Sequence, residues 1–336
     1  MKQRNYSLDI MRVLACLMII SMHSPIPSEN ANGLFLSSLS YFTAPGLCLF
    51  FVISGALLLP VKTDTKSFLI KRLGKVVVPT ICFTLLYLML KTASGEEVDW
   101  SRSICSIPFS AQGHGVLWFM YTLIGLYLVS PIISKWLESV SKREEEFYLG
   151  IWLITLCYPL LDMFLDVNQK DTGILYYFTG YIGYFVLGHY LNKYPQSISL
   201  RILIIPLIIS VFAPVACKVM HVEVNFETVF WYLSIFVAIL CTAIYVIVSK
   251  MSKFLMGGGM VSTIVLTSNL SFGIYLIHIV IMRSFLWKQD WILNINNYIL
   301  QWVVVVALTF ALSWIVAYAI CILPFGDYII GYKKKR

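Results

Sequence analysis

The chain has 336 residues, of which 59% are hydrophobic and only 12% charged, and its mean hydropathy is +0.81. This composition excludes a soluble globular protein with a polar shell and indicates a polytopic membrane protein. The net charge of +8 comes from bases scattered among the loops, so it does not indicate a nucleic-acid-binding protein. The eight cysteines include no pair at two-residue spacing, which favours packing over metal binding.

Apolar runs predict an all-α fold with about ten transmembrane helices in a single domain, residues 1–336. The expected spans are 8–24, 42–60, 76–92, 115–135, 147–165, 174–192, 201–218, 228–248, 261–282 and 298–323. The loop after the second span, KTDTKSFLIKRLGK, carries five bases, so the positive-inside rule places it and both termini in the cytoplasm. This topology puts 19 of the 25 bases inside and 6 outside.

The first span, LDIMRVLACLMIISMHS, contains both a strong base and a histidine. Arg12 and His23 are 11 positions apart, so at about 100° per residue they share one helix face, about 16 Å apart along the axis. A cation within a membrane helix costs about 2.5–3.5 kcal/mol or more, which favours a functional role for Arg12. The alternative is an arginine that snorkels to the inner headgroups.

His23 and Asp9 each have two interpretations. A neutral imidazole in the outer half of the span can take a proton from a hydroxyl, or it can be a hydrogen-bonded structural histidine. Asp9, one turn before Arg12, either pairs with Arg12 or is an N-terminal acid that faces the helix dipole.

A basic cluster of Lys71, Arg72 and Lys75 lies just before the third span. A cluster of this kind at the inner membrane surface can hold the phosphates of a cytoplasmic cofactor. It can also serve topology alone and contact anionic lipid.

Three residues of later spans are further candidates. Trp118, near the outer end of the fourth span, lines a cavity or belongs to the interfacial aromatic belt. His278 on the ninth span, three residues after Tyr275, is a core histidine or a second site residue. The histidine spacings do not indicate a metal site.

Several segments together resemble the membrane acyltransferases of family 3. Arg12 and His23 after the LDIMR start are similar to that family's first helix, and the resemblance extends along essentially the whole chain. The other matching segments are FFVISG (50–55), KRLGKVVVP (71–79), LWFMYTLIGLYLVSP (117–131), GYFVLGHYL (183–191) and SFGIYLIH (271–278).

The resemblance implies a ten-helix enzyme of the bacterial cytoplasmic (inner) membrane. Such an enzyme takes an acyl group, usually acetyl, from acyl-CoA on the cytoplasmic side and delivers it to a hydroxyl of a cell-surface glycan or lipid-linked saccharide. No metal is implied, and the expected partners are membrane lipids and the saccharide acceptor. The inner-loop pattern departs from the family in one respect, because Lys75 stands where members often have a second arginine, and a lysine does not make the bidentate phosphate contact of an arginine.

Carried over by position, His23 is the catalytic base, either deprotonating the acceptor or carrying the acyl group itself. Arg12 faces the acyl-CoA, whose phosphates are expected at Lys71, Arg72 and Lys75, with Asp9 in support. We expect the acceptor pocket to include His278, with Trp118 or Tyr275 stacking on a sugar ring.

The main alternative is a transporter or flippase of a lipid-linked saccharide, which needs no acyl-CoA. No internal repeat of the kind seen in many transporters is evident. A polysaccharide polymerase is less consistent with the sequence, because the longest expected outer loop has only one arginine, Arg102.

Overall fold

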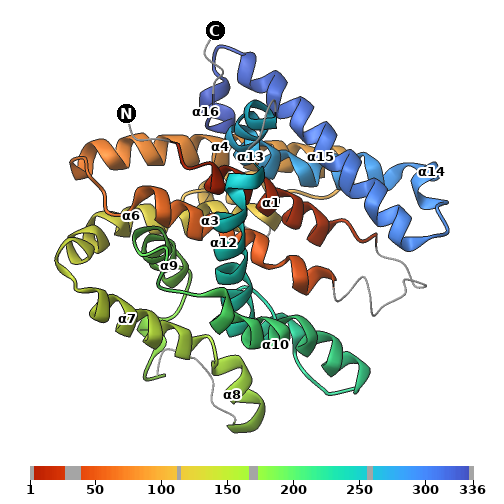
Figure 1. The fold of residues 1–336 in the computed structure, drawn as a ribbon. Coiled ribbons are helices and arrows are strands. Elements are labelled where there is room, and N and C mark those ends of the chain that lie inside the picture. The colour runs from red at the N-terminus through yellow and green to blue at the C-terminus, as the bar shows by residue number, and fades with distance from the viewer. Residues whose placement is uncertain (1–3, 27–38, 112–114, 166–172, 256–259, 333–336) are drawn as a thin grey trace.

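The computed structural model describes residues 4–26, 39–111, 115–165, 173–255 and 260–332, which form helices and no strands (Figure 1). Within these residues, eight helices are long and apolar enough to cross a membrane. The predicted all-α, polytopic membrane class is therefore confirmed. The eight are α1 (Tyr6–His23), α3 (Pro45–Leu58, within a span that begins at Leu39), α4 (Thr65–Ala93), α6 (Trp118–Ser139), α10 (Leu200–Val219), α12 (Ile235–Leu255), α13 (Met260–Ser284) and α15 (Tyr298–Ile322).

Shorter helices complete the described fold. α7 (Lys142–Thr155) and α8 (Tyr158–Leu165) meet at a 42° bend, and together they are apolar enough for a ninth span. The others are α5 (Trp100–Ser106), α9 (Ile182–Lys193), α11 (Phe226–Val229), α14 (Asp290–Leu293), α16 (Gly326–Ile330) and the 3₁₀ turns η1 (Gly115–Leu117), η2 (Tyr176–Phe178) and η3 (Leu286–Lys288).

The prediction of one span over 174–192 is wrong. Gly180 adopts a φ of +101°, which interrupts the segment between η2 and α9. The Trp152 indole donates to the Gly180 carbonyl at 3.0 Å and holds this break in place. With 12 residues, α9 is about 18 Å long and too short for a hydrocarbon core of about 30 Å.

Close backbone contact joins α9 to α3. A Cβ atom on Gly55 of α3 would lie 1.8 Å from the Phe185 carbonyl oxygen, and one on Gly188 of α9 would lie 1.9 Å from that of Val52. Each helix thus presents a glycine to the backbone of the other. Small residues permit such packing where lipid supplies no hydrophobic drive for helix association.

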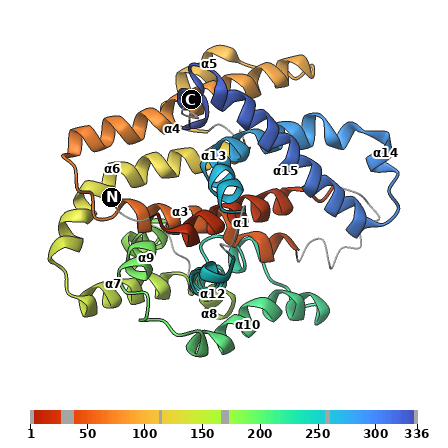
Figure 2. The ribbon, with the colours of Figure 1, turned by 45° about the horizontal axis from the view of Figure 1, so that its top comes forward.

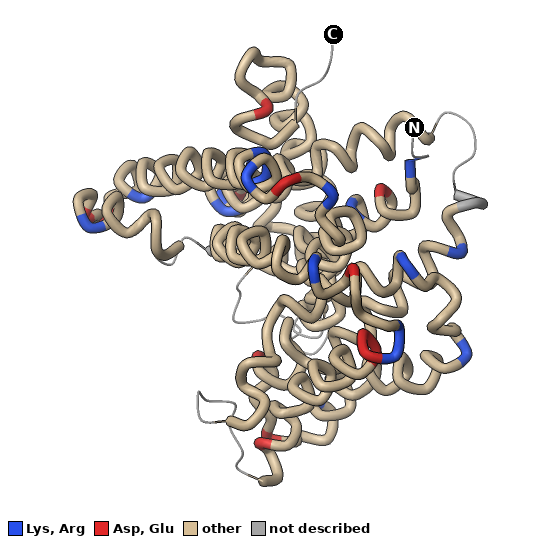
Figure 3. The backbone as a smooth tube through the Cα atoms, turned by 90° about the vertical axis from the view of Figure 1, so that its left-hand side faces the viewer, with Lys and Arg blue, Asp and Glu red and all other residues tan. Residues whose placement is uncertain are grey.

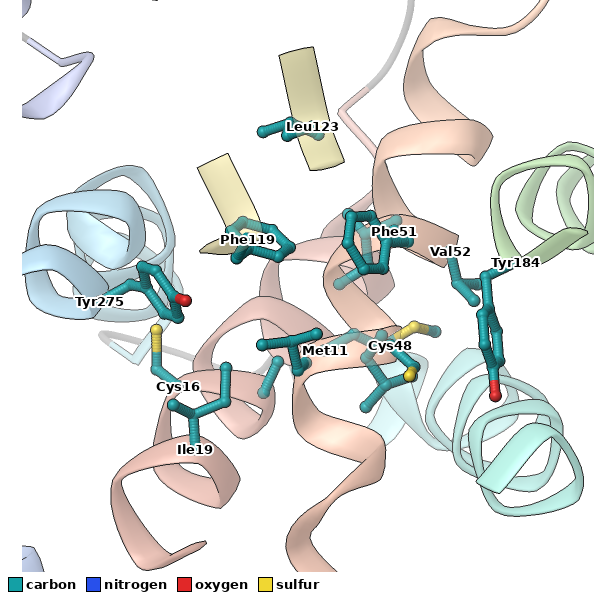
Figure 4. Packing of buried hydrophobic residues seen from close by; sticks show 14 of the residues in the cluster. Met11, Cys16, Ile19, Cys48, Phe51, Val52, Phe119, Leu123, Tyr184 and Tyr275 are labelled. Carbon is teal, nitrogen blue, oxygen red and sulfur yellow. The ribbon is translucent and has the colours of Figure 1, made fainter. Parts of the chain in front are cut away.

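α1 lies at the centre of the bundle and packs against α3, α12, α13 and α15. Met11, Cys16 and Ile19 are buried along its length (Figure 4). Cys16 donates its thiol hydrogen to the Ser271 carbonyl of α13 at 3.4 Å. The central helix therefore holds Arg12 and His23 at fixed positions inside the protein.

The described ends of the chain meet at one end of the bundle. Arg4 donates to the Asn269 side chain of α13 at 3.1 Å, and α16 packs against both α13 and α4. The α3–α4 and α6–α7 connections lie at the left of Figure 2, and α14 lies at the right. Figure 3 shows the molecule from the left-hand side of Figure 1, and Lys and Arg residues are spread over the face that it shows. Lys2 and the bases at 333–336, which the predicted topology counts as inner, lie outside the described residues.

A buried ion pair links α7 to α9. His189 donates from Nδ1 to Glu145 Oε1 at 2.8 Å, and the two side chains are 4% and 0% exposed. Lys193 lies 4.0 Å from the other carboxylate oxygen. Within the described residues, the only hydrogen bond to the Glu145 carboxylate thus comes from His189.

We expect His189→Leu to lower the free energy of unfolding by about 3–5 kcal/mol, because it leaves the Glu145 carboxylate buried without its donor. The matched control is Lys135→Gln, which removes the partner of Glu138 in an ion pair whose lysine is 83% exposed. That change should cost at most about 1 kcal/mol. Thermal unfolding in detergent measures both, and equal losses in the two variants would contradict the assignment.

Candidate active site

A cavity of about 320 Å³ opens at the end of the bundle where α1, α4, α13 and α16 meet. We call it the inner cavity. Its lining residues include Arg12, Phe50, Arg72, Lys75, Phe119, Tyr127, Ser268, Asn269, Ser271, Tyr275, Gly331 and Tyr332.

Three cations face the inner cavity, and none of its described lining residues is acidic. Arg12 comes from α1, whereas Arg72 and Lys75 come from the first turns of α4. None of the three forms an ion pair within the described part of the chain. Unpaired positive charges around one concave space make a site for an anion, and a guanidinium is suited to bind phosphate oxygens in pairs.

Asp9 does not pair with Arg12, so that sequence-based interpretation is wrong. Both oxygens of the buried Asp9 carboxylate accept from Arg4, from Nε at 2.7 Å and from Nη2 at 2.8 Å. The Ser268 hydroxyl of α13 donates a third hydrogen bond at 2.6 Å. The planar fork of Arg4 matches the carboxylate geometry, and Arg12 is left to face the cavity.

Lys71 is exposed and does not line the inner cavity, unlike its neighbours Arg72 and Lys75. It lies one helical turn before Lys75 and directly before Arg72 in the chain. The structure thus brings together two of the three clustered bases.

His23 and His278 lie side by side, with ring centroids 5.6 Å apart. They come from the outer ends of α1 and α13, which pack against each other. His278 is fully buried, and its Nδ1 is hydrogen-bonded to the Tyr275 carbonyl. A carbonyl only accepts, so Nδ1 carries the hydrogen and Nε2 is left as an acceptor. That Nε2 has no partner within the described residues.

A wall of aromatic rings separates the inner cavity from the two histidines. Tyr275 is 3% exposed, and its ring lies 5.1 Å from Phe119, 6.2 Å from Phe50 and 5.6 Å from His278. Its hydroxyl donates to the Val116 carbonyl at 2.6 Å. Figure 4 shows the Phe119 ring between Tyr275 and Phe51. The structure therefore places Tyr275 in this wall and not on an open sugar-binding face.

Trp118 is the first residue of α6 and belongs to an internal aromatic cluster. Its ring lies 5.5 Å from both Tyr181 and Tyr232, and it is half-buried. The structure does not bring Trp118 into the described lining of the inner cavity.

Sequence reasoning missed several cavity residues, among them Tyr127, Asn269 and Tyr332. Nothing in the local sequence marks them, because helices distant in the chain bring them to the cavity. The position of Tyr127 on the buried face of α6 is the one signal that periodicity could have supplied.

Comparison with known proteins gives one finding. A family model described as an acyltransferase domain matches residues 5–318, a range that includes both histidines, the aromatic wall and all three cavity cations. No curated protein and no solved structure matches the chain.

Proposed function

Because the chain belongs to the acyltransferase family whose model spans residues 5–318, and is thus a membrane acyltransferase, we propose that it transfers an acyl group from acyl-CoA to a saccharide. The acyl group is most simply acetyl, and the acceptor is a hydroxyl of a cell-surface glycan or lipid-linked saccharide. The expected location is the cytoplasmic membrane of a bacterium, with the donor on the cytoplasmic side.

The observation that carries the proposal is the inner cavity, where Arg12, Arg72 and Lys75 face one space without an acidic residue in its described lining. CoA carries three phosphates, which need such an unpaired set of cations. In this proposal the phosphates bind at Arg72 and Lys75, and the pantetheine arm extends past Arg12 toward Tyr275. The thioester then reaches His23 when the aromatic wall opens.

The two histidines supply the chemistry. Nε2 of His278 accepts a hydrogen bond from one nitrogen of the neighbouring His23 ring, which leaves the other His23 nitrogen free to act as the base. His23 takes the hydroxyl proton while the oxygen attacks the thioester carbonyl carbon. The carbon–sulfur bond then breaks, and the CoA thiolate leaves and takes the proton from the imidazolium. In the alternative route, a His23 nitrogen attacks first and the acceptor hydroxyl displaces the acyl group from it.

The test is a transfer assay with the purified protein in detergent, acetyl-CoA labelled in the acetyl group, and surface glycans from cells that lack the gene. We expect label in the glycan and one free CoA thiol for each acetyl group transferred. A transporter or flippase would release no thiol. Absence of thiol release with every acceptor would refute the proposed donor.

A further inference from the structure

A second cavity, of about 210 Å³, lies on the other side of the aromatic wall. We call it the outer cavity. It is formed by the last turns of α4 and α13 together with Val116. Val116 accepts the hydrogen bond from Tyr275, and the lining residue Ile279 directly follows His278. The outer cavity therefore adjoins the aromatic wall at Val116, and α13 continues from His278 directly into its lining.

One positive charge of the outer cavity has no acidic partner within the described residues. Lys91 and Arg283 both line the cavity, and Glu96 is its acidic residue. Glu96 pairs with Lys91 at 3.9 Å, which leaves Arg283 without a carboxylate. The Arg283 guanidinium lies 5.5 Å from the Trp287 ring centroid, and this contact orients the group while its N–H edges stay available.

Arg283 follows His278 by five residues on α13, about 7.5 Å along the helix axis, and the His23 ring lies beside His278. When His23 takes a proton from an acceptor, a second positive charge forms near Arg283, and the two charges repel. An anionic group held at Arg283 would offset that repulsion. A neutral acceptor would leave it in place.

We propose that the outer cavity binds the acceptor, and that Arg283 selects acceptors that carry a carboxylate or a phosphate close to the hydroxyl that is acylated. The identification of the bound molecule as the acceptor rests on the proposed function. An acidic sugar and the phosphate of a lipid carrier present the same chemistry, because a guanidinium binds the oxygens of either in pairs.

The experiment measures binding without any acyl-CoA, by isothermal titration of the purified protein in a neutral detergent. The probes are a trisaccharide that ends in glucuronate, the same trisaccharide ending in glucose, and glucose phosphate on a short prenyl chain. We expect at least one anionic probe to bind about tenfold tighter than the neutral trisaccharide, in keeping with a charge-assisted hydrogen bond. Whichever anionic probe binds tighter identifies the source of the anion.

The variants isolate Arg283. Arg283→Gln should remove the preference for the anionic probe, and Arg283→Lys should keep part of it. Lys288→Gln is the matched control, because Lys288 is exposed, close in the chain and outside the described cavity lining. Unchanged acyl-CoA binding shows that each variant is folded.

Equal binding of neutral and anionic probes by the wild type would overturn the proposal, as would an unchanged preference in Arg283→Gln. An unchanged preference in Arg283→Gln would mean that Arg283 contacts only phospholipid headgroups. Because no donor is present, these results are independent of the transfer assay. If the protein transfers acetyl groups but binds neutral and anionic probes equally, only the proposed role of Arg283 is refuted. If it prefers the anionic probe but releases no CoA thiol in the transfer assay, only the proposed donor is refuted.

Discussion

Replacement of His23 by Gln is expected to lower the rate of acyl transfer by about 10²–10⁴-fold, because Gln keeps hydrogen bonding but cannot take a proton. Binding of acyl-CoA should not change, since the three cations of the inner cavity lie on the other side of the aromatic wall. Single-turnover assays measure the rate, and titration of the purified variant measures the affinity.

His221→Gln is the control for this experiment, because His221 is exposed and distant in the chain from both site histidines. The parallel variant His278→Gln separates the two roles. It should reduce the rate by less than His23→Gln, since His278 positions the His23 ring and does not itself take the proton. Substantial transfer by the His23 variant would mean that His23 is structural, and the base must then be His278.

Arg12→Gln is expected to raise the Kd for acyl-CoA by about 10–100-fold, which corresponds to the loss of one charge-assisted hydrogen bond to the donor. The variant should be at least as stable as the wild type, because Arg12 has no ion pair within the described residues and its half-buried charge costs desolvation.

Lys71→Gln is the matched control, since Lys71 belongs to the same basic segment but is exposed outside the inner cavity. Its affinity for acyl-CoA should stay close to that of the wild type. The wild-type affinity should also weaken with ionic strength, as expected for binding of phosphates to cations. Equal affinities in Arg12→Gln and the wild type would contradict the assignment of Arg12 to the donor site.

Periodicity and hydropathy predicted the long membrane helices but not the break at Gly180 within the expected span 174–192. Arg12 lines one cavity with Arg72 and Lys75, two bases of the loop that the positive-inside rule places on the same side as the N-terminus. These features depend on local pattern and on charge, which the sequence shows directly.

Contacts between distant helices could not be predicted in the same way. Asp9 binds Arg4 because α13 supplies Ser268 and thereby fixes the direction of the carboxylate. The contact of His23 with His278 depends on the packing of α1 against α13. The burial of Tyr275 depends on rings from α3 and α6, and no single segment contains that information.

The glycine contact between α3 and α9 has a consequence for how the enzyme moves. Helices whose backbones touch at Gly55 and Gly188 cannot slide past each other without steric collision, so they form a rigid frame. Phe50 belongs to that frame because it lies on α3, and only Phe119 and Tyr275 of the wall are on other helices. We therefore expect the wall to open by displacement of α6 or α13. Since α13 also carries His278, the step that admits the thioester would at the same time reposition this imidazole beside His23, so that a single helix movement would act on both the donor path and the histidine pair.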